Sequence, residues 1–271
     1  MNSSSSDVTS SVQPVGHLVR HWRQRRRLSQ MALALDAGLS TRHLSFIETG
    51  RSRPSPEVLM AVADQLDVPL RERNTMLLAA GYAPRYAQRS LQAPDMRPVQ
   101  EALTRLLDAH HPYPGLVLDS QWNVVQANKA AMGLASLLPE ALRTPTLNIY
   151  RASLHPEGLA RFTRNLEDWA VHLLANLRRS IESSGDPALI ALEAEVLGYP
   201  RIREASRRAP APTAQPLLVP CLLDLPTASV SLFTTLTSFG TPQDVTLQEL
   251  CIELFYPADV ASEQALRAMA A

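Results

Sequence analysis

The chain of 271 residues has little of what marks several common protein classes. Its two cysteines exclude a disulfide framework and a cysteine-rich metal site, and they favour a reducing compartment. Its ten glycines form neither a phosphate-binding loop nor a dinucleotide-binding pattern. No apolar run is as long as a membrane span, and the serine-rich N-terminus lacks the apolar core of a secretory signal. We therefore expect a cytoplasmic protein that does not enter a membrane.

Charge is distributed unevenly, although the formal net charge is zero. Residues 14–89 carry 12 arginines against 6 acidic side chains, whereas residues 90–271 carry 14 basic and 19 acidic side chains. Lys129 is the only lysine. A basic part followed by an acidic part indicates two domains with different tasks. The chain is long enough for two domains, and its 45% hydrophobic residues suffice for two cores.

Five short helices are predicted in residues 14–81, after a disordered tail at 1–13. Three serines stand where an N-cap is expected, and three glycines stand where a left-handed residue ends a helix. These residues are Ser29, Ser40, Ser55, Gly38, Gly50 and Gly81. The apolar side of the second helix is expected to consist of Met31, Leu33, Ala34 and Leu35.

The second and third predicted helices form a helix-turn-helix by their length and by the tight turn between them. In that motif the later helix enters the major groove of DNA. Leu44 and Ile47 are expected to face the core of the domain. This leaves four residues on or near the exposed side of the helix: Thr41, Arg42, Ser45 and Phe46. An arginine can pair with guanine through two hydrogen bonds, and a phenylalanine can cover the methyl group of thymine.

Phosphate contacts are expected next to this helix, from Gln30, Arg51 and Arg53. Alternatively, the arginines only solvate a small helical bundle. Spacing, turn, caps and charge agree, however, and favour binding to double-stranded DNA. One helix-turn-helix covers a short site, so a homodimer on two half-sites is expected.

Residues 82–97 have little periodicity and are predicted to be a linker. Residues 98–271 combine helices with five β-rich runs, which predicts an α+β domain on an antiparallel sheet. A long amphipathic helix is expected from Gly158 to Ser184. The last β-rich run is expected from Leu247 to Pro257.

The stretch LSQMALALDAGLSTRHLSFIETGRSRPSPEVLMAVADQLDVPL resembles the helix-turn-helix domain of the XRE/Cro-C1 family of bacterial and phage regulators. Arg23 and Glu48 match an arginine–glutamate pair that joins the first and third helices in that family. The resemblance therefore implies a structural role for Glu48. It also implies phosphate contacts by Gln30 and Arg51, and base-reading positions at Thr41, Arg42 and Phe46. Phage repressors often have a polar residue where this chain has a phenylalanine.

The later segments PYPGLVLDSQWNVVQAN and SLFTTLTSFGTPQDVTLQELCIELFYPAD are similar to those of a narrower group, the MmyB-like regulators. Their C-terminal part is a PAS-like ligand-binding domain. The resemblance implies an apolar pocket, for which a fatty acid or similar lipophilic molecule is the expected ligand. We single out five residues as candidates to touch it: Asn128, Trp169, His172, Phe233 and Phe239. Each residue also has a structural interpretation. The asparagine can cap a helix, the aromatic rings can belong to the core, and the histidine can have its hydrogen bonds satisfied within the protein.

The sequence is compatible with three functions. The first is a sequence-specific transcriptional regulator whose C-terminal domain senses a small lipophilic ligand. The second is a DNA-binding regulator whose C-terminal domain only dimerises or recruits a protein. The third is an enzyme with a DNA-binding domain, but the sequence contains no GxSxG pattern and no histidines or cysteines at metal-ligand spacing. We therefore predict no catalytic residue, metal site or cofactor.

Overall fold

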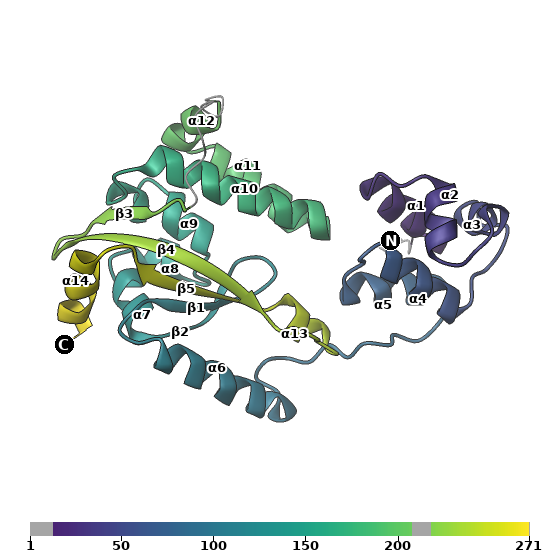
Figure 1. Cartoon of the computed structure of the whole chain (residues 1–271), viewed down its shortest axis with the longest axis horizontal. Coiled ribbons are helices and arrows are strands. Elements are labelled where there is room, and N and C mark those ends of the chain that lie inside the picture. The colour runs from purple at the N-terminus through teal and green to yellow at the C-terminus, as the bar shows by residue number, and fades with distance from the viewer. Residues whose placement is uncertain (1–12, 208–217, 271) are drawn as a thin grey trace, which may run out of the picture. The chain divides into compact units, whose positions relative to one another are not determined.

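The computed structural model describes residues 13–207 and 218–270 (Figure 1). The tail predicted at 1–13 therefore lies outside the described residues, except for its last residue. Within the described ranges, no helix combines the length and the apolar character needed to cross a membrane.

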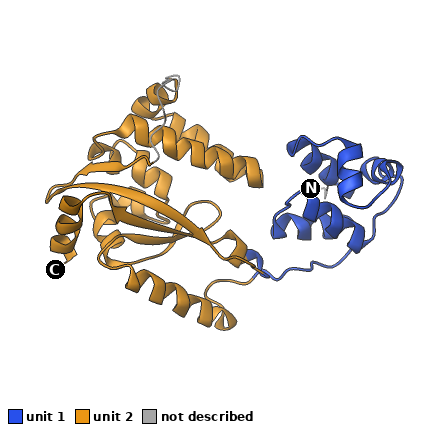
Figure 2. Ribbon diagram, viewed as in Figure 1, with its two compact units in different colours: residues 1–88, 243–245 blue, residues 89–242, 246–271 orange. Residues whose placement is uncertain are grey.

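The chain divides into two compact units (Figure 2). The first comprises residues 1–88 and 243–245, and the second comprises residues 89–242 and 246–271.

The first unit is helical, as predicted. In its described part the helices are α1 (Val15–Arg25), α2 (Gln30–Asp36), α3 (Thr41–Glu48), α4 (Pro56–Gln65) and α5 (Leu70–Ala79). The predicted caps are present, because the hydroxyl oxygens of Ser29, Ser40 and Ser55 each accept a hydrogen bond from a backbone N–H in the first turn. Gly38 follows α2 with φ +68°, a conformation that a side chain would strain.

The core of the first unit is built by one face of each helix, and α2 contributes less to it than predicted. Leu33 and Ala34 are buried, but Met31 and Leu35 are 71% and 79% exposed. At about 3.6 residues per turn, Met31 and Leu35 lie on the side of the helix opposite Leu33. The predicted apolar side of this helix is therefore confirmed for Leu33 and Ala34 and wrong for Met31 and Leu35.

Helices α1 and α3 approach closely at Gly16. A Cβ atom at this position would overlap the carbonyl oxygen of Ile47. Glycine is therefore the residue that allows the two helices to pack at this distance.

The second unit is built on a five-stranded sheet, and every strand pair is antiparallel, as predicted. The strand order is β2-β1-β5-β4-β3. The strands are β1 (Gly115–Leu118), β2 (Val124–Ala127), β3 (Cys221–Asp224), β4 (Ser229–Ser238) and β5 (Cys251–Pro257). Leu116 of β1 and Leu236 of β4 both lie opposite Glu253 of β5, so these three side chains point to the same face.

Helices cover both faces of this sheet (Figure 1). Leu103 and Leu107 of α6 pack on Val117 and Ile252 at one face. The opposite face lies under α7, α9 and α10. The helices of the described part are α6 (Arg97–Ala109), α7 (Lys129–Ala135), α8 (Glu140–Arg143), α9 (Ile149–Leu154), α10 (Leu166–Ser184), α11 (Pro187–Leu197), α12 (Pro200–Arg207), α13 (Val245–Glu249) and α14 (Val260–Ala270), with 3₁₀ turns at Pro94–Met96 and Leu159–Arg161.

The long amphipathic helix begins later than predicted, at Leu166 instead of Gly158. The preceding backbone pairs with the β3 edge instead, because the N–H of Arg164 donates to Leu222 and the N–H of Asp224 donates to Phe162. These hydrogen bonds join residues far apart in sequence and outweigh the local helical pattern. The last β-rich run was also predicted too long, since its first residues belong to α13. Helices α8 and α9 were not predicted.

Candidate DNA-binding surface and ligand cavity

The exposed side of α3 carries the residues predicted to read bases. Leu44 and Ile47 are buried, as predicted. Thr41 and Arg42 are exposed, whereas Ser45 and Phe46 are half-buried. The carbonyl of Phe46 accepts hydrogen bonds from the N–H groups of residues 51 and 52, which closes the end of the helix.

Two arginines flank the ring of Phe46. The guanidinium carbon of Arg42 lies 5.2 Å from the ring centroid, and that of Arg51 lies 6.0 Å from it. Each cation–π contact at such an exposed site is worth about 0.5–1 kcal/mol. The ring of Phe46 therefore keeps Arg42, which is predicted to read bases, close to Arg51, which is predicted to contact a phosphate.

Glu48 joins three helices from a buried position, 4% exposed. Arg23 of α1 donates from Nε and Nη2 to the two carboxylate oxygens, at 2.6 and 2.9 Å. Gln30 of α2 donates from Nε2 at 2.8 Å. Burial opposes ionisation of Glu48, but these hydrogen bonds and the charge of Arg23 outweigh it and lower the pKa of the carboxyl. The pair implied by the resemblance is therefore present, and the glutamate has a structural role.

The other predicted phosphate contacts differ in what they touch. The side-chain amide of Gln30 has two hydrogens, and one of them bonds to Glu48. The second hydrogen can still be donated to a phosphate. Arg53 is exposed, but its Nη2 donates to the carbonyl of Gly81 at 3.2 Å. Its guanidinium carbon also lies 4.6 Å from the ring centroid of Tyr82. A phosphate contact by Arg53 would compete with these interactions.

The second unit contains an apolar cavity of about 60 Å³ between the sheet and helices α7, α9 and α10. Most of its lining side chains are aliphatic, and polar atoms come from few residues, among them Ser153 and Thr163. The lining includes Leu116, Ile149, Trp169, Cys221, Leu232 and Phe255. Such a lining suits an apolar group.

Trp169 is the one of the five ligand candidates that lines this cavity. His172 stacks on it, with ring centroids 5.3 Å apart. Burial, and then the positive charge of Arg179, lower the pKa of His172. The histidine therefore favours its neutral form and supports the ring that faces the cavity.

The remaining three candidates lie elsewhere. Asn128 caps α7: its Oδ1 accepts from the N–H groups of Ala131 and Gly115, and its Nδ2 donates to two backbone carbonyls. Phe233 stacks on Tyr256, with centroids 5.3 Å apart. Phe239 packs against the cluster on the α6 side of the sheet.

Residues 99–269 match the family model described as the MmyB-like transcription regulator ligand binding domain. The chain belongs to the MmyB-like transcription regulators. In this MmyB-like regulator, residues 14–76 also match a model described as a helix-turn-helix domain. A search of curated proteins found no match. The two models identify a DNA-binding transcriptional regulator with a ligand-binding domain.

Sequence reasoning missed a buried acid in the ligand-binding domain of this MmyB-like regulator. Glu253 is 5% exposed and lies on the cavity side of β5. Burial raises the pKa of its carboxyl to about 7, although a hydrogen bond with Thr234 lowers it in part. In a strand, alternate side chains point to the same face, so Glu253 lies on the same face as Cys251 and Phe255. This alternation could have indicated from the sequence that Glu253 is buried.

Both cysteines of the MmyB-like regulator lie near this carboxyl. Burial, together with the negative charge of Glu253, raises the pKa of Cys221 to about 12 and that of Cys251 to about 11. The thiols therefore stay protonated near neutral pH. Among the described residues, no three histidine, cysteine or acidic side chains are placed to hold a metal ion.

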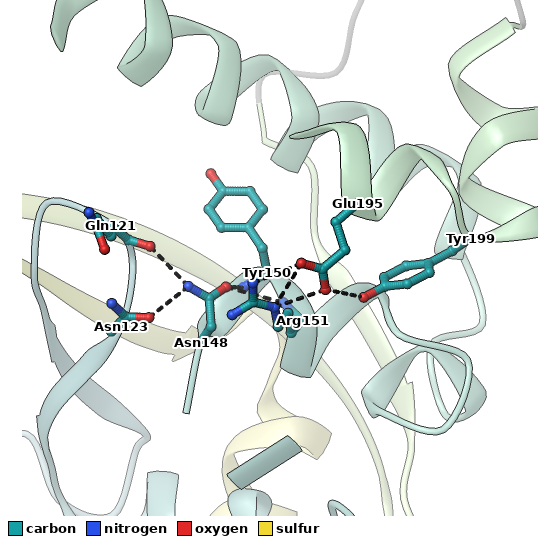
Figure 3. A network of polar contacts seen from close by, with 7 residues as sticks. All are labelled: Gln121, Asn123, Asn148, Tyr150, Arg151, Glu195 and Tyr199. Atoms are coloured by element: carbon teal, nitrogen blue, oxygen red, sulfur yellow. Dashed lines mark hydrogen bonds and ion pairs between the residues drawn. The ribbon is translucent and has the colours of Figure 1, made fainter. Parts of the chain in front are cut away.

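Helix α9 of the MmyB-like regulator, which lines the cavity, is held by polar contacts at its start (Figure 3). Oδ1 of Asn148 accepts from the N–H groups of Tyr150 and Arg151. Its Nδ2 donates to the backbone carbonyl of Gln121 at 2.9 Å and to Oδ1 of Asn123 at 3.0 Å. The same residue thus caps α9 and ties it to the β1–β2 turn, a cap that sequence analysis missed.

A second contact ties α9 to α11 (Figure 3). Arg151 donates from Nε and Nη2 to the two carboxylate oxygens of Glu195, at 2.8 and 2.7 Å. Tyr199 donates its hydroxyl to the same carboxylate at 2.9 Å. These bonds fix one wall of the cavity from outside.

Proposed function

We propose that this regulator binds a specific DNA site as a homodimer in the cytoplasm, and that its C-terminal domain senses a small lipophilic ligand such as a fatty acid. The domain limits that we propose are 14–81 for DNA binding, 82–97 for a linker and 98–271 for a PAS-like ligand-binding domain. The five-stranded antiparallel sheet supports the PAS-like assignment. The protein is proposed to act by binding, without catalysis.

The exposed position of Arg42 on α3, beside the ring of Phe46, is the observation that carries the DNA-binding proposal. The bases are read from α3, and the phosphates are contacted beside it. Bases are assigned to Thr41, Arg42, Ser45 and Phe46, and phosphates to Gln30, Arg51 and Arg53.

Replacing Arg42 by alanine is expected to weaken binding to the preferred operator by about 1–3 kcal/mol, because a bidentate pair with guanine is lost. The operator is first selected from a random duplex library, and binding is then followed by fluorescence anisotropy at fixed salt. Discrimination at one base pair relaxes in the variant. Arg85→Ala is the control, since it removes an exposed cation of the same unit. Unchanged operator affinity in Arg42→Ala would refute the assigned recognition face.

Replacing Arg51 by alanine is expected to weaken binding to all sequences by similar factors. The slope of log K against log salt should become shallower by about 0.9, the value for one lost phosphate contact. Titrations of the operator and a scrambled duplex over a salt series give both quantities. A loss confined to the operator would assign Arg51 to base readout instead.

The ligand proposal rests on the apolar cavity lined by Trp169. His172 is proposed to support the Trp169 ring, whereas Asn128, Phe233 and Phe239 do not line the cavity. Mass spectrometry of an organic extract of the natively purified protein tests the proposal. A stoichiometric lipophilic compound supports sensing. An extract without one, together with no binding of added fatty acids, favours a domain that only dimerises or recruits a protein.

A further inference from the structure

A second hollow, of about 410 Å³, lies in the ligand-binding domain between α7, α14 and the turn that joins β3 to β4. We refer to it as the α7–α14 groove. Its walls are largely apolar, and among its lining residues Lys129 carries a positive charge and none is acidic. The lining residues include Pro114, Lys129, Leu134, Leu225, Leu266 and Met269.

The groove adjoins the apolar cavity, because Pro114 and Leu134 line both. These two side chains therefore stand between the two hollows. The cavity, at about 60 Å³, is well below the roughly 300 Å³ at which small-molecule sites usually begin. The groove, at about 410 Å³, falls within the usual range. We infer that a ligand of ordinary size that enters the cavity extends into the adjoining groove.

Lys129 is available to bind a ligand. Its side chain is exposed and, among the described residues, makes no hydrogen bond or ion pair. As the first residue of α7, its positive charge opposes the helix dipole, so the charge does not stabilise that helix. Its long aliphatic stem can lie along an apolar wall while the ammonium group stays at the surface.

We propose that the groove holds the carboxylate head group of a lipophilic acid, paired with the ammonium of Lys129. The hydrocarbon chain then passes between Pro114 and Leu134 into the apolar cavity. The proposal rests on the proposed function, that the domain senses a lipophilic ligand, and it adds the head-group chemistry and the direction in which the ligand lies. A neutral hydroxyl can accept a hydrogen bond from the lysine but forms no ion pair with it, so the site favours acids over alcohols of the same chain length.

The test compares decanoate with 1-decanol on the full-length protein by isothermal titration calorimetry. In Lys129→Gln the dissociation constant for decanoate should rise about fivefold, which corresponds to the upper end of the energies measured for exposed ion pairs. The dissociation constant for decanol should stay unchanged. Lys129→Arg keeps the charge and should bind decanoate nearly as the wild type does. Arg143→Gln removes an exposed cation of the same domain outside both hollows and is the matched control.

The outcomes separate this proposal from the proposed function. If decanoate and decanol both bind, and Lys129→Gln changes neither or acts no more strongly than Arg143→Gln, the head-group site is wrong while lipid sensing stands. If neither compound binds the wild type, lipid sensing and the head-group site both fail.

The single lysine offers an independent readout. Decanoate, but not decanol, should slow acylation of Lys129 by an N-hydroxysuccinimide ester, followed by peptide mass spectrometry. Equal acylation rates with and without saturating decanoate would overturn the proposal.

Discussion

Replacing Glu48 by alanine is expected to destabilise the helix-turn-helix unit by about 3–5 kcal/mol, the cost of leaving one charge of a buried ion pair without its partner. Arg23 loses both of its hydrogen bonds to the carboxylate, and Gln30 loses one. Because this amount is a large share of the stability of a small domain, operator binding should be lost as well.

Hydrogen–deuterium exchange of the full chain measures the effect by region. Peptides from α1 and α3 should lose protection in Glu48→Ala, whereas peptides from β1 and β5 should keep it. Asp36→Ala is the control, since it removes an exposed acid of the same unit. Wild-type protection of α1 in the Glu48 variant would mean that the ion pair does not hold the helices together.

Replacing Glu253 by glutamine is expected to stabilise the ligand-binding domain by about 3 kcal/mol at pH 8 and to have little effect at pH 4. The pKa of this carboxyl is about 7 in the folded domain and near its ordinary value of 4.5 in the unfolded chain. Between these values the folded state holds a proton that the unfolded state has lost, so stability falls as pH rises. Below the lower value both states are protonated, and the difference disappears.

Urea unfolding of the wild type and the variant between pH 4 and pH 8 gives the difference in the free energy of unfolding at each pH. Glutamine keeps the shape of the side chain and an oxygen that can accept from Thr234. Glu204→Gln, on the exposed surface of α12, is the control and should show no such trend. A difference that does not change with pH would show that the carboxyl keeps an ordinary pKa.

The parts predicted correctly are those that local chemistry decides. The caps at Ser29, Ser40 and Ser55 each depend on a backbone N–H three residues away, so the start of each helix is visible in a short window of sequence. The buried pair Leu44 and Ile47 follows from the helical period in the same way.

The parts predicted wrongly depend on contacts between distant segments. The start of α10 was misplaced because Phe162 and Arg164 pair with β3, about sixty residues later in the sequence. No local pattern separates Trp169, which faces the cavity, from Phe233, which stacks on Tyr256. The sequence indicates which aromatic side chains are candidates to line the cavity, but the packing of helices on the sheet determines which of them reach it.

The ring of Phe46 between Arg42 and Arg51 has a consequence for how operator preference can change. Replacing Phe46 by a residue without an aromatic ring removes both cation–π contacts at once, one from an arginine proposed to read sequence and one from an arginine proposed to supply affinity. The two contributions are energetically coupled, and their changes do not simply add. A change of this ring that alters the preferred base is therefore expected to alter the phosphate contact proposed for Arg51 as well.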